Sequence, residues 1–378
     1  MFLLRKTDSV FKHLTPDKIR RILVCAPNWI GDAVMCIPAL QGIRLAFSSA
    51  EIFLLARPSV ANLLEAHSCV DRIIEYEHQG EHSGLVGKWR LGRTLQSLCC
   101  DLGVLFPNSF DAALIAFLAR IPRRFGYATD ARSLLLTDAV ALPLQARQMH
   151  QVKYYEGFIR AICPTYSSTP PVLSVSIEDE ARANKLLAGH AVPEDGVLLG
   201  LNPGSVYGGA KRWLPERFAE AADHIVQNMV TRGLHVDRVR CAIVGAPGEE
   251  VLGQRIAGLM QTKPVVLSGK TSLGVLKAVI QRCRLFLTND TGPMHIASAL
   301  GVPVVAVFGP TNHAATSPYG EDHILVRTSV DCSPCMLREC PIDHRCMTEV
   351  TVEQVVRAAE QVLAGKGPSP FGKIWVDP

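Results

Sequence analysis

The stretch LFLTNDTGPMH, residues 285–295, is the most informative part of this chain for its fold. The apolar run 285–288 predicts a buried strand, and helix-compatible residues follow through Leu300. An acid, a hydroxyl, a glycine and a histidine therefore collect where a parallel strand leads into a helix, the place where open α/β sheets bind ligands. We expect Asp290 to accept hydrogen bonds from ligand hydroxyls or loop N–H groups, and Gly292 to let an anion approach the backbone. The alternative is a helix N-cap followed by proline.

A second junction of the same kind lies near the start of the chain. The strand-like run RILVC, residues 21–25, is followed by APNWIGD, residues 26–32, and then by a helical pattern over 33–47. Asp32 stands at the start of this helix, where the helix dipole keeps a carboxylate ionised and where it is well placed to act as a general base. Its alternative role is again that of an N-cap.

A third junction is rich in glycine and carries positive charge. The loop LNPGSVYGGAKRWLP, residues 201–215, follows the expected strand 197–201 and precedes a helix expected over 215–233. Three glycines and Ser205 are suited to accept an anion, and Lys211 with Arg212 supplies the opposite charge. The alternative is a solvated basic turn.

Length and composition favour a globular α/β protein of two domains. The chain has 378 residues, 48% of them hydrophobic and 20% charged, with a net charge of +4. This mild charge and the 6% of aromatic residues argue against a nucleic-acid partner. No apolar run reaches the roughly 18 residues of a membrane span, and the start of the chain lacks the features of a secretory signal, so we expect a cytoplasmic protein.

Strand-like and helical patterns alternate along both halves, which predicts an α/β fold with two parallel sheets covered by helices. Three prolines between Cys163 and Pro171 mark the expected connection between the halves. The predicted domains are residues 1–172, residues 173–350, and a C-terminal helix and tail over 351–378. Within the strand pattern we expect strands at 22–25, 52–56 and 102–106 in the first half. In the second half we expect strands at 198–201, 240–244, 265–267, 285–288 and 303–308.

Twelve cysteines are many for a cytoplasmic chain. Eight of them lie in apolar patterns, where a free cysteine behaves as a small hydrophobic residue. The other four cluster at Cys332, Cys335, Cys340 and Cys346. Four thiolates so close together could bind zinc or an iron–sulfur cluster, but the spacing is not that of a zinc ribbon, and reduced loop thiols are the alternative that we favour.

Six motifs in this order resemble a known family. They are PNWIGD (27–32), FPNSFDAAL (106–114), NPGSVYGGAKRW (202–213), VGAPGEE (244–250), SGKTSL (268–273) and NDTGPMHIASALG (289–301). From about Arg21 to about Leu363 the chain is similar to the ADP-heptose:lipopolysaccharide heptosyltransferases of glycosyltransferase family nine, and most similar to the heptosyltransferase II group. The resemblance implies the glycosyltransferase B-type fold, in which two Rossmann-like domains contribute to one active site and the C-terminal helix returns towards the first domain.

The resemblance also implies the reaction. The expected activity is inverting transfer of L-glycero-D-manno-heptose from ADP-heptose to heptosyl-Kdo-lipid A in lipopolysaccharide inner-core biosynthesis. The expected partners are this nucleotide-sugar donor and a lipid-linked acceptor at the inner membrane surface, with the enzyme peripheral to that membrane. No metal cofactor is expected for catalysis, because Lys211 and helix N-termini can carry the departing diphosphate.

By motif match, Asp32 is the expected base and Lys211 the group that neutralises the pyrophosphate. The other expected donor-binding residues are Ser205, Glu249, Thr271, Asp290, Thr291, Gly292 and His295. Glu249 resembles the acid that binds the adenosine ribose, and Thr271 a residue that packs on adenine. The alternatives are a helix-start acid for Glu249 and a core histidine for His295.

The acceptor implied by the resemblance is anionic, so the first domain should offer cations and hydrogen-bonding groups to it. The candidates are Arg57, Asn108, Ser109, Arg120, Arg123 and Arg124. A solvated surface position is the alternative for the arginines.

Two other functions stay open at the level of the sequence. One is a nucleotide-sugar-binding module without turnover, against which the presence of Gly31 and Asp32 argues. The other is a heptosyltransferase with a different acceptor, including heptosyltransferase I.

Overall fold

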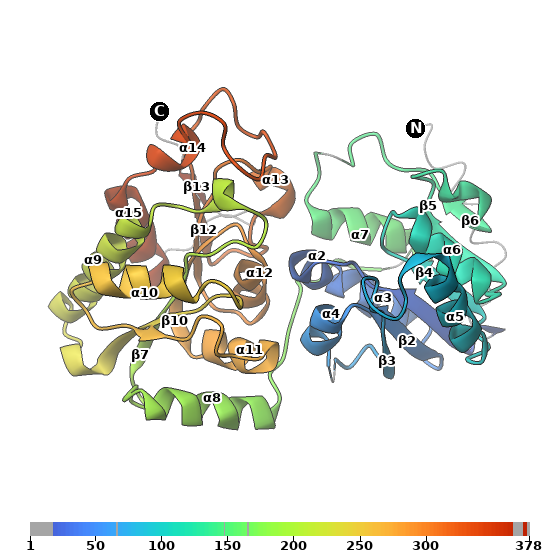
Figure 1. Cartoon of the computed structure of the whole chain (residues 1–378), viewed down its shortest axis with the longest axis horizontal. Coiled ribbons are helices and arrows are strands. Elements are labelled where there is room, and N and C mark those ends of the chain that lie inside the picture. Colours follow the sequence, from blue (N-terminus) through green and yellow to red (C-terminus); the bar gives the residue numbers. More distant parts are fainter. Residues whose placement is uncertain (1–17, 66, 147, 165, 366–372, 376–378) are drawn as a thin grey trace. The chain divides into compact units, whose positions relative to one another are not determined.

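The computed structural model describes residues 18–65, 67–146, 148–164, 166–365 and 373–375. The chain divides into two compact units, Met1–Pro171 and Val172–Pro378 (Figure 1). Each unit is built around one parallel β-sheet with helices on both faces, which is the doubly wound arrangement.

The sheet of the first unit has six strands in the order β3-β2-β1-β4-β5-β6. The strands are β1 (Arg21–Cys25), β2 (Glu51–Ala56), β3 (Arg72–Glu75), β4 (Leu102–Leu105), β5 (Arg123–Tyr127) and β6 (Asp138–Val140). The helices are α2 (Ile30–Met35), α3 (Ile37–Ala46), α4 (Pro58–Leu63), α5 (Gly84–Gln96), α6 (Phe110–Leu118) and α7 (Gln151–Arg160).

The sheet of the second unit has seven strands in the order β13-β12-β11-β10-β7-β8-β9. These are β7 (Val197–Asn202), β8 (Val239–Ile243), β9 (Val265–Val266), β10 (Cys283–Asn289), β11 (Val304–Val307), β12 (His323–Val326) and β13 (Lys373–Trp375). The helices are α8 (Ile177–Gly189), α9 (Pro215–Thr231), α10 (Glu250–Leu259), α11 (Leu273–Gln281), α12 (Gly292–Ala299), α13 (His313–Thr316), α14 (Arg345–Thr348) and α15 (Val352–Leu363).

The central strands form because their apolar runs can be buried on both faces of a sheet. In β7 and β10, Leu199, Leu201, Leu285 and Leu287 are fully buried in one core cluster. Gly200 allows close packing between these strands, because a Cβ atom there would lie 2.4 Å from the Phe286 ring. Burial of this kind fixes the register of the two strands whose ends carry the second unit's site.

The expected helix over 33–47 is instead two helices, α2 and α3, which meet at Cys36. Pro38 is the second residue of α3, and because it has no N–H group it cannot continue the hydrogen bonding of α2. The division places Asp32 on a helix of six residues.

The C-terminal segment contributes to the second unit. Helix α15 packs against α9 and against β10, β11 and β12, and β13 pairs with β12. The return of this segment towards the first unit, which the resemblance implies, stays a prediction. Among the described residues, no helix is long and apolar enough to cross a membrane.

Candidate functional site

Both sheets have a point where the strand order reverses, and the expected site loops lie at these points. In the first sheet β1 pairs with both β2 and β4, and in the second sheet β7 pairs with both β8 and β10. The loops after β1 and β4 therefore meet at the carboxyl edge of the first sheet, and those after β7 and β10 at that of the second. Such crevices are the usual ligand sites of doubly wound sheets.

In the second unit, the glycine-rich loop and the β10–α12 junction are joined by an ion pair. The Lys211 ammonium lies 2.7 Å from Oδ2 of Asp290, and both side chains are largely buried. The Thr311 hydroxyl donates to the same carboxylate oxygen at 2.6 Å. The Asp290 carboxylate thus pairs with the Lys211 ammonium and accepts a hydrogen bond from Thr311. A bound anion would have to share Lys211 with Asp290. Thr311 had no signal in the sequence.

Two asparagines at strand ends hold these loops in place, and neither is among the expected site residues. Asn289 donates to the carbonyl of Pro203 at 2.7 Å and accepts from the Trp213 backbone N–H at 3.1 Å. Asn202 donates to the Thr291 hydroxyl at 2.8 Å. Their position in the sequence could have identified them, because each is the last residue of a central strand.

Glu249 lies against the loop that follows β7. Its Oε2 accepts from the Ala246 N–H at 2.8 Å, and a Cβ atom at position 204 would lie 2.2 Å from its carboxylate, so only glycine fits there. Its Oε1 is buried and has no hydrogen-bond partner among the described residues, and Arg212 Nη2 lies 3.7 Å away. A buried oxygen without a donor is suited to accept from a ligand hydroxyl.

The remaining donor-site candidates surround these groups at the same edge. Ser205 is buried in the glycine-rich loop, and its carbonyl accepts from Arg212 at 3.1 Å. Gly292 is the first residue of α12, and His295 is buried one turn further on. Thr271 precedes α11, on a loop whose Gly269 N–H donates to the carbonyl of Gly245 at 3.0 Å.

A segment far along the chain, residues 331–346, covers the glycine-rich loop; we call it the strap. The Tyr207 hydroxyl donates to the Met336 carbonyl at 2.7 Å, and the Gly209 N–H donates to the Glu339 carboxylate at 2.8 Å. The Ala210 N–H donates to the Arg338 carbonyl at 2.9 Å. The strap therefore fixes the backbone immediately before Lys211.

The strap also adds charge beside Lys211. The Tyr207 ring lies 4.7 Å from the Lys211 ammonium and 5.4 Å from the Arg338 guanidinium. At these distances an aromatic face attracts cations, so Tyr207 helps to hold two positive groups next to each other.

The four clustered cysteines lie on the strap. Burial, followed by the neighbouring thiols of Cys332, Cys335 and Cys340, raises the pKa of Cys346 to about 11. No disulfide joins the cysteines, and within the described residues no group of three or more His, Cys, Asp or Glu side chains is arranged to hold a metal ion.

In the first unit, Asp32 lies in the first turn of α2, directly after β1. It is half-buried, near the buried phenol of Tyr155 from α7. Burial and then the Asp32 carboxylate raise the pKa of Tyr155 well above its ordinary value, so this phenol stays neutral beside Asp32. The Asp32 carboxylate thus lies at the N-terminal end of a helix, where the helix dipole favours negative charge.

Asn108 and Ser109 follow β4 and lie at the same edge as Asp32. The Asn108 amide donates to the Tyr154 hydroxyl at 2.7 Å and accepts from Arg132 at 3.3 Å. The Ser109 hydroxyl accepts from the Ala112 N–H and caps α6. Arg132 is fully buried below this loop and was missed, since no motif marks it; it also donates to the Tyr127 carbonyl at 2.8 Å.

The arginine candidates separate into two groups. Arg57 directly follows β2 at the carboxyl edge, and its Nε is buried without a hydrogen-bond partner among the described residues. Arg120, Arg123 and Arg124 lie at or just before the amino end of β5, which is the opposite edge of the sheet. Their placement does not support the expected acceptor role.

The last two of these arginines have structural partners. Arg123 makes two contacts to Asp138, at 2.8 and 2.5 Å. Arg124 donates to the Leu135 carbonyl at 2.5 Å and covers the Phe117 ring. These contacts join β5 to β6, to the segment before β6 and to the end of α6.

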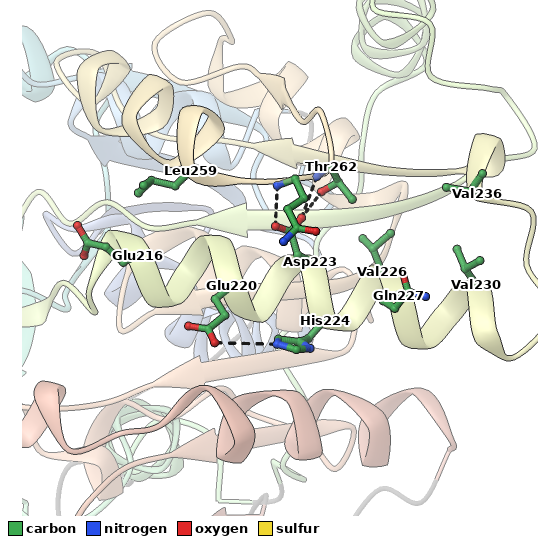
Figure 2. A pocket seen from close by; sticks show the side chains of 11 residues that line it. Glu216, Glu220, Asp223, His224, Val226, Gln227, Val230, Val236, Leu259 and Thr262 are labelled. Carbon is green, nitrogen blue, oxygen red and sulfur yellow. Dashed lines mark hydrogen bonds and ion pairs between the residues drawn. The ribbon is translucent and has the colours of Figure 1, made fainter.

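A surface hollow between α9 and α10 is lined by several acids but belongs to the packing of the fold (Figure 2). Its Asp223 accepts from the N–H groups of Gln261 and Thr262 at 2.7 and 3.0 Å, so this carboxylate holds the end of α10. His224 and Glu220 are paired at 4.0 Å (Figure 2).

Solved glycosyltransferase structures share this fold. The glycosyltransferase family 9 structure from Veillonella parvula has a TM-score of 0.81 at 24% identity, covering 92% of this chain and 98% of the other. The structure of ADP-heptose lipopolysaccharide heptosyltransferase II from E. coli has a TM-score of 0.74 at 24% identity, covering 92% and 99%. With two units that each hold one parallel sheet, the fold is that of a glycosyltransferase of the B type.

Sequence similarity assigns the chain to one family among the B-type glycosyltransferases. The family model of glycosyltransferase family 9 (heptosyltransferase) matches residues 88–345, and the chain belongs to this family. A lipooligosaccharide heptosyltransferase 2 from Haemophilus ducreyi is 28% identical over 365 residues, covering 91% of this chain and 99% of the other. The chain is therefore a glycosyltransferase enzyme.

Proposed function

We propose that this enzyme transfers L-glycero-D-manno-heptose from ADP-heptose to heptosyl-Kdo-lipid A, in the inner core of lipopolysaccharide. The observation that carries the proposal is the set of loops around Lys211, Asp290 and Glu249 at the switch point of the second sheet. The similarity to lipooligosaccharide heptosyltransferase 2 over nearly the whole length of both chains supports the same acceptor class.

The donor is proposed to bind to the second unit. Its diphosphate receives charge from Lys211 and hydrogen bonds from the Ser205 loop and from the Thr291–Gly292 turn. Oε1 of Glu249, which accepts no hydrogen bond from the described residues, accepts from a ribose hydroxyl, and Thr271 packs beside the base. Because Lys211 already contacts Asp290, its ammonium would be shared between the Asp290 carboxylate and the bound diphosphate.

Transfer is proposed to proceed by a single displacement with inversion. Asp32 takes the proton of the acceptor hydroxyl while the oxygen of that hydroxyl forms a bond to C1 of the heptose. The bond from C1 to the ADP oxygen breaks on the opposite face, and the charge that develops on ADP is stabilised by Lys211 and the adjoining N–H groups. The residues present can carry this charge, so no metal ion is assigned a step.

The acceptor is proposed to bind along the carboxyl edge of the first sheet, near Arg57, Asn108 and Ser109. Its lipid part stays in the inner membrane, and the enzyme works at the cytoplasmic surface of that membrane. Arg57 supports this assignment because its buried Nε lacks a partner among the described residues.

The decisive experiment is incubation of the purified chain with ADP-heptose and a panel of truncated core acceptors, followed by mass spectrometry. We expect one heptose to be added to heptosyl-Kdo-lipid A and none to Kdo-lipid A. Addition to Kdo-lipid A instead would identify a heptosyltransferase I-like enzyme. Binding of ADP-heptose without transfer to any acceptor would identify a binding module and refute the proposal.

A further inference from the structure

Helix α5 of the first unit has one face built into the core. Leu91 and Leu95 belong to the core cluster, and Gly92 is closely packed, since a Cβ atom there would lie 2.6 Å from Leu118 of α6. This inner face anchors the helix, and its orientation is therefore fixed by the fold.

The opposite face of α5 exposes large apolar side chains. Leu85, Val86 and Trp89 are 75%, 70% and 54% exposed. All three lie within the first two turns of the helix, so they form one patch. Exposed apolar residues scattered singly need no explanation, whereas a tryptophan and two aliphatic residues gathered on one helix face favour contact with an apolar partner.

Two arginines of the same helix add positive charge to this patch. The helix sequence GLVGKWRLGRTLQ contains Arg90 and Arg93 and no acidic residue, and its third basic residue, Lys88, is paired with Asp111. The Arg93 guanidinium lies over the Trp89 ring at 5.7 Å. Arg90 is 3.9 Å from Glu81 and solvent-exposed, so this weak pair leaves its charge accessible.

We propose that this face of α5, with Leu85, Val86, Trp89, Arg90 and Arg93, docks the enzyme on the surface of a bilayer that contains anionic phospholipids. Aliphatic side chains enter the boundary of the acyl chains, tryptophan prefers the interface, and arginines contact lipid phosphates. The inference rests on the proposed function in one respect only, namely that the acceptor is embedded in a membrane.

The position of α5 fits this role. The helix follows β3, and Lys88 near its N-terminal end pairs at 2.5 Å with Asp111 in the first turn of α6. Helix α6 starts at the carboxyl edge of the sheet, directly after Asn108 and Ser109. The exposed turn of α5 is thus next to the edge where the acceptor is proposed to bind, and a docked bilayer would bring the lipid-linked sugar to that edge.

The size of the patch argues against a protein partner. A stable interface buries about 800 Å² on each partner. Three side chains on one helix face provide only a fraction of this area, whereas a membrane contact needs only a few anchors combined with charge.

The test is flotation of the full-length chain with vesicles of phosphatidylethanolamine and phosphatidylglycerol, compared with neutral phosphatidylcholine vesicles. We expect binding to the anionic vesicles. Leu85→Glu and Trp89→Glu should each lower the partition coefficient about tenfold or more, since they replace an apolar anchor by a charge that the lipid repels. Arg90→Ala should lower it about fivefold at low salt and have little effect at high salt.

Matched controls are Val251→Glu on α10 and Arg182→Ala on α8, both at exposed positions of the second unit. They should float like the wild type. All variants are at exposed sites, and melting curves should agree with that of the wild type. Wild-type protein that does not float, or Leu85→Glu protein that floats unchanged, would overturn the proposal.

Two further measurements distinguish loss of membrane binding from other effects of the Leu85→Glu substitution. Transfer to a water-soluble, deacylated acceptor should be the same for Leu85→Glu and the wild type, and a loss there would overturn the proposal by making the face part of the sugar site. A change in the sedimentation coefficient of Leu85→Glu would overturn it in favour of a second copy of the chain. If the wild type floats but transfers no heptose to any acceptor, the proposed function fails while the membrane contact stands.

Discussion

At the scale of single residues, Lys211 is paired with Asp290 and is also the group proposed to bind the diphosphate of the donor. Its ammonium lies 2.7 Å from the Asp290 carboxylate and 4.7 Å from the Tyr207 ring. Such a pair keeps the ammonium in a defined position at little net gain in stability, because burying both charges costs about as much as their attraction returns. Preorganisation of this kind is what a site for a diphosphate leaving group requires.

We therefore expect Lys211→Met to weaken ADP binding about 10- to 100-fold, since a charge-assisted contact is worth about 1.5–3 kcal/mol. Heptose transfer should slow as well. Calorimetric titration with ADP measures the first effect, and Lys185→Met on the exposed surface of α8 is the control. The double variant Lys211→Met/Asp290→Asn should recover thermal stability without recovering affinity. Unchanged affinity and unchanged rate for Lys211→Met would show that the diphosphate binds elsewhere.

At the scale of elements, the strap and the glycine-rich loop act as one unit. Glu339 accepts from the Gly209 N–H at 2.8 Å, and His344 contacts the Ala210 carbonyl at 2.8 Å, so two residues before Lys211 are held by a segment about 130 positions away. The four cysteines of the strap flank these contacts. The contacts themselves involve no thiol, so the strap positions the glycine-rich loop whether or not the thiols are modified.

Glu339→Ala should raise the dissociation constant of ADP about three- to tenfold, because the loop loses an acceptor worth about 0.5–1.5 kcal/mol. Glu339→Gln keeps an acceptor oxygen and should bind ADP nearly as the wild type does. Titration of both variants, with Glu349→Ala as an exposed control, measures the difference. Equal affinities for the alanine and glutamine variants would mean that the strap does not position the loop.

Strand β12 carries a buried histidine whose titration should affect stability. Burial lowers the pKa of His323 from 6.5 to about 4. Between these pH values the unfolded chain binds more protons, so the free energy of unfolding falls as the pH falls, whereas above 6.5 the contribution is complete.

We expect His323 to lower the free energy of unfolding by about 3 kcal/mol between pH 7 and pH 4. His323→Gln should remove that part of the slope, and His190→Gln, at an exposed position after α8, should not. Urea unfolding at several pH values measures the slopes. Parallel slopes for wild type and His323→Gln would contradict the assignment.

At the scale of the whole molecule, the sequence was most informative where burial is continuous. Central strands such as β7 and β10 could be predicted because apolar runs buried on both faces leave a clear signal. Strands β3 and β5 were missed because β3 is partly exposed and β5 begins with two partly exposed arginines, and β6 has only three residues. Strand β12 was missed although all four of its residues are buried. The loops with Asp32, Lys211 and Asp290 were found because each combines a strand end, a helix start and a charged residue.

The rest of the site depends on contacts that local patterns do not encode. The pairing of Lys211 with Asp290, the burial of Arg132 under Asn108 and the strap over Gly209 join residues 24 to 130 positions apart. The arginines near β5 were misplaced for a related reason, because which edge of the sheet they occupy follows from strand direction and not from their spacing.

We propose that catalysis as a whole needs no divalent cation. Activity in excess EDTA should equal activity with magnesium, because Lys211 and backbone N–H groups carry the charge of the leaving group. A rapid loss that magnesium reverses would refute this. A slow loss accompanied by unfolding, restored only by zinc, would instead assign a structural metal to the cysteines of the strap and leave the reaction unchanged.

The most direct test of the central claim is the Asp32→Asn variant, because it separates binding by the second unit from chemistry at the first. The account predicts that transfer from ADP-heptose to heptosyl-Kdo-lipid A falls about 10²- to 10⁴-fold, while the dissociation constant of ADP changes little. Asp237→Asn, at an exposed position of the second unit, should change neither. Near-wild-type transfer by folded Asp32→Asn protein would contradict the account.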